Sequence, residues 1–293
     1  MTTLHAVDPD ITLLIPTLGR EILRGTLLSV IAGEAWPVQT VIVDQGRQAG
    51  IARLTDELRL RGLDILYIPS DRIGRSVALN TGMARVATRF VVITDDDCQV
   101  ATDWLARMGE RLRRHEPAIV TGRVEAGAGE VQLSVVTTDR ESIQRRPAVR
   151  FDRLSGGNMG MPLTVPGRIG SFSEDALMRF AEDTEFAYRA LRAQVPIVYA
   201  PEAVVRHLGW RDGSEREQQY RNYARSHSVF FGRQLRKGDG FICLRASVHL
   251  LRATRRWLSG ALRGDAETAA HGKAYVTEFL PGLRAGWRSG AAP

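Results

Sequence analysis

Short apolar segments alternate with helix-like segments through the first half of the chain, and this alternation constrains the fold more than any other feature. The helix-like segment 21–34, for example, places Leu23, Leu27 and Val30 on one side. Runs of apolar or β-branched residues that end in polar or turn residues occur at 11–17, 40–46, 64–70, 89–97 and 118–124. Strands that alternate with helices predict an α/β fold with a doubly wound, mostly parallel, Rossmann-like sheet.

Acidic residues stand where two of the predicted strands end. Asp44 follows the second strand, and Asp95, Asp96 and Asp97 follow the fourth. In doubly wound sheets, ligands bind outside the carboxyl ends of the strands. Two like charges about 4 Å apart repel by about 4 kcal/mol at an effective dielectric constant of about 20. Bulk water, nearby arginines or a bound cation would each offset that repulsion, and only the cation implies a function.

Common phosphate-binding and zinc-binding motifs are missing from the sequence. The turn after the first strand reads PTLGRE (16–21), not G-x-G-x-x-G, and no G-x-x-x-x-G-K-[ST] occurs. The two cysteines and six histidines show no zinc-binding spacing. If the protein handles a phosphate group, we expect it to use a metal ion instead of a glycine-rich cradle.

Three downstream segments carry polar residues that have ordinary structural explanations when each is taken alone. The glycines of RLSGGNMGM (153–161) fit a plain loop. Glu182 and Asp183 open a predicted helix, where acidic residues usually serve the helix dipole and the cap. His207 lies in the predicted strand segment 196–210, and a single histidine is more often structural than metal-binding. The order of these residues along the chain is more specific than any one of them.

In that order, the features resemble the family 2 glycosyltransferases, which have the GT-A fold. The resemblance covers residues 11–210, about two-thirds of the chain. The runs EDTEFAYRA and VVRHLGW, and VDQG at 43–46, are most similar to the bacterial rhamnosyl- and galactofuranosyltransferase branches. VDQG replaces the commoner V-D-D-G-S of the family. The five features that carry the resemblance are Asp44, the D-x-D of Asp95 and Asp97, the G-G-N at 156–158, Glu182-Asp183 and His207.

The resemblance implies an inverting, metal-dependent glycosyltransferase that moves a sugar from a nucleotide-diphosphate donor to an acceptor hydroxyl by single in-line displacement. A Mn²⁺ or Mg²⁺ ion held by Asp95, Asp97 and His207 would neutralise the leaving diphosphate. Asp183 would be the general base, with Glu182 as the neighbouring alternative. The residues implied in donor binding are Thr17, Arg20, Asp44, Gln45, Arg75, Asp95 and Asp96. Those implied in acceptor or sugar binding are Gly156, Gly157, Asn158 and Trp210.

The C-terminal third carries the whole excess of positive charge. Residues 201–293 have a net charge of +8, whereas the first 200 residues have a net charge of −1. We expect a catalytic domain at 1–210 and a basic, mostly helical extension at 211–293. In the predicted helix 241–263, leucines fall on one face and basic residues on the other. Such a helix can lie on an anionic membrane, or pack on the catalytic domain with its arginines in water, and both alternatives stay open.

The remaining predictions concern location and partners. No secretory signal and no apolar run of about 20 residues is visible. We expect a cytoplasmic enzyme, with peripheral contact at the inner face of the plasma membrane. The nucleotide (UDP, dTDP or GDP) and the acceptor (a saccharide, a lipid-linked acceptor or a natural product) stay open.

Two other functions are alternatives to the transferase. One is a catalytically inactive nucleotide-sugar-binding protein. The other is a binder of polyanions or nucleic acid that uses the basic C-terminal third. A nucleic-acid partner is disfavoured because the clustered carboxylates would have no use in such a binding cleft.

Overall fold

The computed structural model describes residues 5–127, 138–208 and 213–289, and the chain divides into two compact units. The first unit comprises residues 1–146, 153–172 and 186–209. The second comprises residues 147–152, 173–185 and 210–293. The first unit ends at residue 209, and the predicted catalytic domain at residue 210. The second unit also includes residues 147–152 and 173–185, which the prediction had placed in the catalytic domain.

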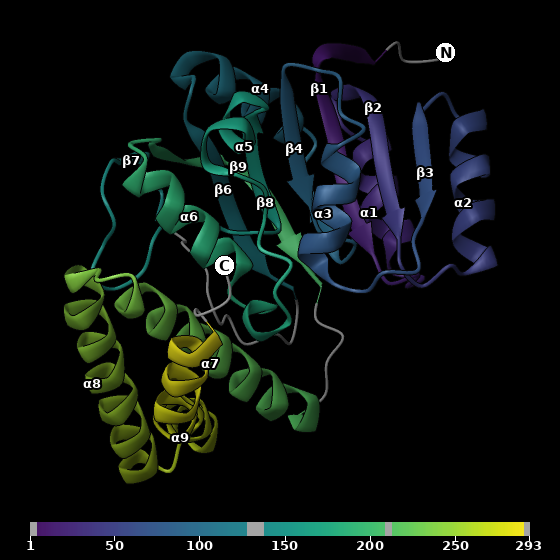
Figure 1. Ribbon diagram of the computed structural model, residues 1–293. Coiled ribbons are helices and arrows are strands. Elements are labelled where there is room, and N and C mark those ends of the chain that lie inside the picture. Colours follow the sequence, from purple (N-terminus) through teal and green to yellow (C-terminus); the bar gives the residue numbers. More distant parts are fainter. Residues whose placement is uncertain (1–4, 128–137, 209–212, 290–293) are drawn as a thin grey trace. The chain divides into compact units, whose positions relative to one another are not determined.

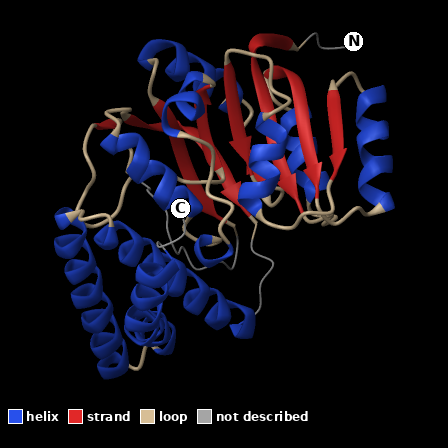
Figure 2. Cartoon of the chain, in the orientation of Figure 1, coloured by secondary structure: helices blue, strands red, loops and turns tan. Residues whose placement is uncertain are grey.

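A mixed β-sheet forms the centre of the first unit (Figures 1 and 2). Its strands are β1 (Ala6–Thr17), β2 (Ala35–Asp44), β3 (Ile65–Pro69), β4 (Phe90–Thr94), β5 (Cys98–Val100), β6 (Ile119–Ala126), β7 (Ser142–Gln144), β8 (Asn158–Pro162) and β9 (Ile197–His207). They lie in the order β3-β2-β1-β4-β8-β6-β9-β5, with β7 paired to β9. The block β3-β2-β1-β4 is parallel, whereas β8 runs antiparallel to both of its neighbours.

Helices cover both faces of this sheet (Figure 1). Those of the first unit are α1 (Leu23–Ile31), α2 (Ala49–Leu60), α3 (Arg75–Met83), α4 (Trp104–His115), α5 (Thr164–Ile169) and most of α6 (Glu182–Arg192). Successive residues of a strand point to opposite faces, so continuous apolar strands serve two cores. Leu13 and Ile15 join the core under α1, α2 and α4, while Leu14 between them joins the core under α3, α5 and α6.

The predicted fold class, an α/β fold of GT-A type with a C-terminal helical extension, is confirmed. All five predicted strands form in the first half of the chain. The plain-loop alternative for 153–161 is wrong for its second part, because residues 158–162 form β8 in the middle of the sheet. Its residues Met159 and Met161 are fully buried, and this apolar alternation fits a strand.

The second unit is helical. It contains the 3₁₀ turn η1 (Ala176–Met178), the first turn of α6, and the helices α7 (Gly213–Arg236), α8 (Gly240–Arg263) and α9 (Ala266–Ser289). Glycines let the helices approach closely: a Cβ at Gly286 of α9 would lie 2.1 Å from the Val229 carbonyl of α7. A Cβ at Gly272 of α9 would lie 2.3 Å from the Trp257 nitrogen of α8.

The leucine face of helix α8 differs from the packing alternative. Leu251 is 70% exposed and Leu262 is 88% exposed, and Leu244 and Leu258 are also exposed. Arg245 is instead 1% exposed and pairs with Asp152 of the same unit at 2.6 Å. The leucines therefore do not pack as that alternative requires, whereas Arg252, Arg256 and Arg263 are exposed, as it expects.

Candidate active site

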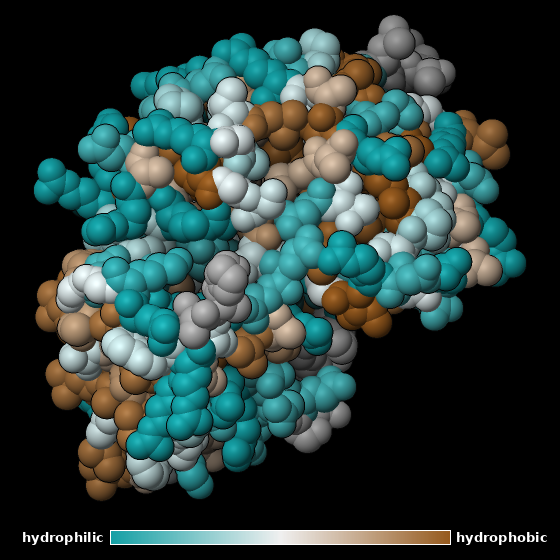
Figure 3. Space-filling model, in the orientation of Figure 1, coloured by the Kyte–Doolittle hydropathy of each residue, from teal (hydrophilic) through white to brown (hydrophobic). Residues whose placement is uncertain are grey.

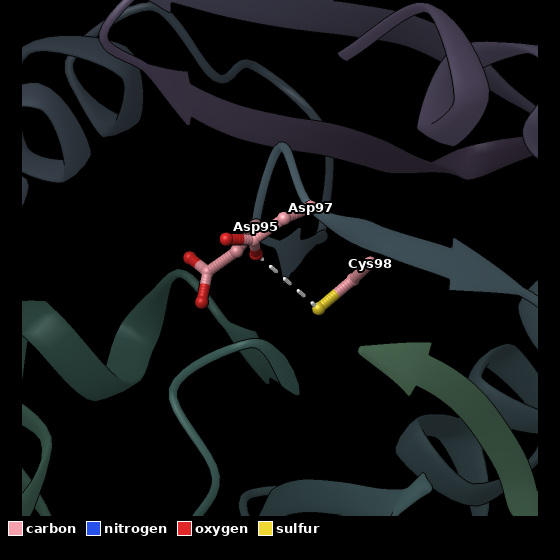
Figure 4. Close-up of side chains that lie close together, drawn as sticks. All are labelled: Asp95, Asp97 and Cys98. Carbon is pink, nitrogen blue, oxygen red and sulfur yellow. Dashed lines mark hydrogen bonds between the residues drawn. The ribbon is translucent and has the colours of Figure 1, made fainter. Parts of the chain in front are cut away.

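The turn after β4 separates the three aspartates into two groups. Oxygens of Asp95 and Asp97 and the sulfur of Cys98 lie within 4.8 Å of one another (Figure 4). Asp96 turns away from them and is 1% exposed. Asp95 and Asp97, the two aspartates of the D-x-D, therefore lie close together, and Asp96 is not part of that group.

Asp96 is held by the loop that follows β1. Thr17 Oγ1 donates a hydrogen bond to its Oδ2 at 2.6 Å, and Arg20 donates to both of its carboxylate oxygens. Burial raises the pKa of Asp96, and the hydrogen bonds from Arg20 and Thr17 oppose that shift. Thr17 and Arg20, which were predicted to bind the donor, therefore contact the aspartate cluster through Asp96.

Asp97 is brought next to His207 by the pairing of β5 with β9. In that pair Cys98 lies opposite His207, and Leu208 N donates to the Asp97 carbonyl at 2.8 Å. His207 Nε2 lies 3.5 Å from Asp97 Oδ1, and Arg20 Nη2 lies 3.3 Å from Asp97 Oδ2. Asp97 therefore contacts His207, although residue 207 is far from residue 97 in the sequence, whereas the group whose ligand atoms all lie within 4.8 Å of one another contains Asp95, Asp97 and Cys98.

Cys98 lies in the cluster but has the wrong chemistry for a hard metal ion. Burial first, and then the charges of Asp95 and Asp97, raise the pKa of its thiol well above the usual range. A thiol is a soft ligand, whereas Mg²⁺ and Mn²⁺ prefer hard oxygen ligands. The oxygens of Asp95 and Asp97 and the imidazole of His207 remain as a donor set that suits Mg²⁺ or Mn²⁺.

Asp95 is held by Arg75, at the start of α3. Arg75 Nε donates to Asp95 Oδ1 at 2.9 Å, and Arg75 Nη2 donates to the Gly156 carbonyl at 2.7 Å. Both glycines of the G-G-N segment lie close to these two side chains. A Cβ at Gly157 would lie 2.7 Å from Asp95 Oδ2, and one at Gly156 would lie 3.1 Å from the Arg75 guanidinium.

The electrostatic balance of the cluster explains how three adjacent carboxylates are tolerated. Arg20 bridges Asp96 and Asp97, and Arg75 pairs with Asp95. Arginines therefore supply part of the compensation. Three carboxylates carry one charge more than two guanidinium groups, so the cluster still favours a cation.

Asp44 and Gln45 shape the neighbouring loops at the end of β2. Asp44 is fully buried, and its Oδ1 accepts hydrogen bonds from the nitrogens of Gly46 and Arg47. The Tyr67 hydroxyl donates to Asp44 Oδ2 at 2.8 Å; burial, together with this carboxylate, raises the pKa of Tyr67 to about 12. The Gln45 amide bonds to backbone atoms of Arg72 and Gly74 just before α3.

Asn158 is placed differently from its predicted sugar-binding role. It is fully buried in β8, where its amide nitrogen donates to the carbonyls of Arg123 and Ala203, each at 2.8 Å. Its Oδ1 accepts a hydrogen bond from Trp104 Nε1 at 2.9 Å. The structure therefore does not support Asn158 as a direct sugar contact; it ties the centre of the sheet together. Trp210 lies outside the described residues.

The predicted base and its alternative belong to the second unit. Glu182 and Asp183 open α6, and Glu182 is 6% exposed while Asp183 is partly buried. Asp183 Oδ1 accepts a hydrogen bond from Thr184 N at 2.6 Å. An acidic first turn is also favourable for the helix dipole, so the position alone does not distinguish a base from a cap.

Sequence reasoning missed several hydroxyls that hold the site together. Thr26 Oγ1 donates to the Asp96 carbonyl at 2.8 Å, and Thr94 Oγ1 donates to the Gly157 carbonyl at 2.9 Å. A hydroxyl inside an otherwise apolar segment was the available signal, as for Thr94 and for Tyr67 in DILYIPS.

Comparison with protein families identifies the first half of the chain. The model of glycosyl transferase family 2 matches residues 12–165, which is more than half of the sequence. The chain belongs to glycosyl transferase family 2. This family consists of enzymes that transfer sugars.

A characterised relative within the family is glycosyltransferase GlyA of Streptococcus pneumoniae serotype 4 (strain ATCC BAA-334 / TIGR4). It is 26% identical over 117 residues, which are 40% of this chain and 17% of that protein. The family 2 chain described here thus matches less than a fifth of the length of this relative.

Solved structures of other glycosyltransferases share the fold. S. aureus TarS 1–349 has a TM-score of 0.58 at 14% identity, over 92% of this chain and 90% of TarS 1–349. The mannosyltransferase PcManGT from Pyrobaculum calidifontis, in complex with GDP-Man and Mn²⁺, has a TM-score of 0.63 at 16% identity, over 99% of this chain and 88% of PcManGT. TarS 1–349 has also been solved with UDP-GlcNAc. At these identities the likeness concerns the fold.

Proposed function

We propose that this protein is an inverting, metal-dependent glycosyltransferase that moves a sugar from a nucleotide-diphosphate donor to an acceptor hydroxyl. The observation that carries the proposal is the closeness of the Asp95 and Asp97 carboxylates after β4, with His207 next to Asp97. Doubly wound sheets bind ligands at the carboxyl ends of their strands. Family membership supports the same reaction class.

Asp95, Asp97 and His207 would hold the Mn²⁺ or Mg²⁺ ion. When bound, such an ion acts as a Lewis acid that stabilises the charge growing on the departing diphosphate. The presence of Mn²⁺ in the PcManGT complex supports a divalent cation for the shared fold.

Arg20 and Arg75 lie next to these carboxylates, and their guanidinium groups could donate charge-assisted hydrogen bonds to the oxygens of the diphosphate. Thr17, Asp44 and Gln45 lie at or just after the ends of β1 and β2, and we assign them with Asp96 to the nucleoside side of the donor. The relatives' complexes with UDP-GlcNAc and GDP-Man support UDP and GDP as donor nucleotides, and dTDP stays a third candidate.

Asp183 is the proposed general base, with Glu182 as its alternative. It would accept the proton of the acceptor hydroxyl as that oxygen attacks the anomeric carbon on the face opposite the diphosphate. Proton transfer of this kind contributes about 10²–10⁴-fold in rate. On the sugar side we retain Gly156, Gly157 and Trp210. The acceptor classes are a saccharide, a lipid-linked acceptor and a natural product.

A thermal-shift screen with UDP, dTDP and GDP, each with Mn²⁺, Mg²⁺ or EDTA, tests the donor site. A ligand that binds only the folded protein raises its melting temperature. We expect one diphosphate to do so, and the shift to vanish in EDTA and in Asp97→Ala. Binding without turnover, even toward water, would instead support the inactive binder. If the protein binds a polyanion in a salt-sensitive way, and Asp97→Asn does not change this binding, the basic C-terminal third would be the functional surface.

Transfer assays test the chemistry separately. Asp183→Asn should keep donor binding and lose transfer, and inversion should appear in the configuration of the product's new bond. Normal transfer by Asp183→Asn would exclude Asp183 as the base. In that case Glu182→Gln becomes the informative variant.

We propose in addition that α8 rests on an anionic membrane surface. Its exposed leucine face consists of Leu244, Leu251, Leu258 and Leu262, and Figure 3 shows hydrophobic side chains along the outer edge of the molecule over α8. No Asp or Glu occurs in α8, and Arg252, Arg255, Arg256 and Arg263 are all exposed. Pairing this face with a second copy would bring arginines together, whereas anionic lipid headgroups would attract them.

Among the described residues, no helix is both long and apolar enough to cross a bilayer. The proposed contact therefore lies in the membrane interface. At low salt, the protein should sediment with vesicles that contain anionic lipid but not with zwitterionic vesicles. The double variant Leu251→Ser/Leu258→Ser should no longer sediment with the anionic vesicles. The matched control is Leu60→Ser on α2, where Leu60 is 91% exposed; it should sediment like the wild type. Self-association in place of vesicle binding would exclude the membrane.

A further inference from the structure

A chain of polar side chains reaches the proposed base from inside the helical unit. Thr184 Oγ1 lies 3.4 Å from Asp183 Oδ1 and 3.3 Å from His227 Nε2. His227 Nδ1, on the other side of the ring, lies 2.8 Å from the Tyr275 hydroxyl. The chain thus links the first turn of α6 to α7 and α9, and all four residues belong to the second unit.

The chemistry of the four groups gives these hydrogen bonds a single consistent direction. An ionised carboxylate only accepts, so the Thr184 hydroxyl donates to Asp183 Oδ1. Thr184 Oγ1 can then accept from the N–H at His227 Nε2. That tautomer leaves His227 Nδ1 to accept from the Tyr275 O–H. Every donor in the chain has an acceptor, and the chain ends on the carboxylate.

The helical surroundings keep the interior members of the chain uncharged. Burial, and next the neighbouring His249, lower the pKa of His227 to about 3. Burial raises the pKa of Tyr275 well above its usual range. At neutral pH a neutral imidazole and a neutral phenol therefore face each other, which the proposed direction of donation requires.

We infer that Thr184, His227 and Tyr275 are positioning residues that fix the orientation of the Asp183 carboxylate. The inference rests on the proposed role of Asp183 as the base. Thr184 N and the Thr184 hydroxyl both donate to Oδ1, so together they fix the position of that oxygen. A base must sit within hydrogen-bond reach of the proton that it removes, and a misplacement of about 1 Å can reduce the rate about 10²-fold.

Isosteric variants separate this role from packing. Thr184→Val keeps the shape and removes the hydroxyl, and we expect kcat to fall about 10–100-fold with the KM for the donor unchanged. Thr184→Ser restores the hydroxyl and should restore most of kcat. Thr277→Val is the matched control, because Thr277 lies in α9 of the same unit and its hydroxyl bonds only the carbonyl of Ala274 among the contacts described. That control should leave kcat unchanged.

A double variant tests whether the residues act as one chain. Tyr275→Phe should lower kcat about 3–10-fold, but it should add little in the Thr184→Val background, where the chain is already broken. If the two substitutions lowered kcat by the product of their separate factors, the inference would be overturned. It would also be overturned if Thr184→Val had the wild-type kcat while Asp183→Asn was inactive; Asp183 would then still be the base. Full transfer by Asp183→Asn would instead remove the base itself, so the two failures are distinguishable.

Discussion

The two units of this protein treat charged side chains differently. At the edge of the sheet, the charged cluster is partly open to solvent: the side chains of Asp95 and Arg20 are 28% and 27% exposed, whereas those of Asp96 and Asp97 are 2% and 5% exposed. In the helical unit, the Asp152–Arg245 pair is closed off, with both side chains 1% exposed. A reachable cluster can exchange its partners for a ligand, whereas a sealed pair can only serve the fold. Four substitutions or conditions test that contrast, ordered by their expected effect on the free energy of unfolding.

The sealed pair should give the largest effect of any single residue. Asp152→Asn leaves Arg245 charged and buried without its carboxylate partner, and we expect a loss of about 3–5 kcal/mol in the free energy of unfolding. Chemical denaturation measures it. Glu57→Gln is the matched control, because the Arg24–Glu57 pair at 2.8 Å is exposed to solvent, which screens it, and should contribute little to stability. Equal effects of the two variants would refute the contrast between the units.

Acid should destabilise the helical unit through its histidines. Burial lowers the pKa of His227 to about 3, and that of His249 and His271 to about 4. An unfolded histidine has a pKa of about 6.5, so below that pH the unfolded chain binds more protons and stability falls. At pH 5 each histidine should account for up to about 2 kcal/mol. Thermal unfolding from pH 7 to pH 5 measures the slope, which His249→Gln should reduce; a flat profile would contradict it.

Close helix packing should give an intermediate effect. The Cβ of Gly286→Ala would meet the Val229 carbonyl at 2.1 Å, so α7 and α9 must separate. Overpacking of this kind costs about 1–3 kcal/mol. Gly240→Ala, where a Cβ meets nothing within 4 Å, is the control and should be neutral or slightly stabilising in thermal unfolding.

The glycine of the sheet site should show the smallest effect on stability and a clear effect on binding. The Cβ of Gly157→Ala would lie 2.7 Å from Asp95 Oδ2, the end of a short side chain that can move. We expect unfolding to change by less than about 1 kcal/mol, while the diphosphate–metal thermal shift falls because Asp95 is displaced. Gly167→Ala in α5, where a Cβ meets nothing, is the control. An unchanged ligand shift would contradict the metal role of Asp95.

Local patterns predicted the parts of the site that lie at strand ends. Asp44 and the aspartates after β4 were identified because polar residues that interrupt an apolar run stand out in the sequence. The proximity of His207 to Asp97 was implied only by the family resemblance, since the β5–β9 pairing joins residues more than a hundred positions apart. The saturation of the Asn158 amide within β8 had no local signal at all.

By itself, the sequence determined the alternation of strands and helices, the two cores and the carboxylates at the sheet edge. These features follow from periods of two and 3.6 residues, which are local properties of the chain. Only the tertiary structure decided that Asp96 turns to Thr17 and Arg20, and that the leucine face of α8 lies outward. An amphipathic pattern shows that two faces differ but not which one finds a partner, because that choice depends on close contacts such as those of Gly272 with α8.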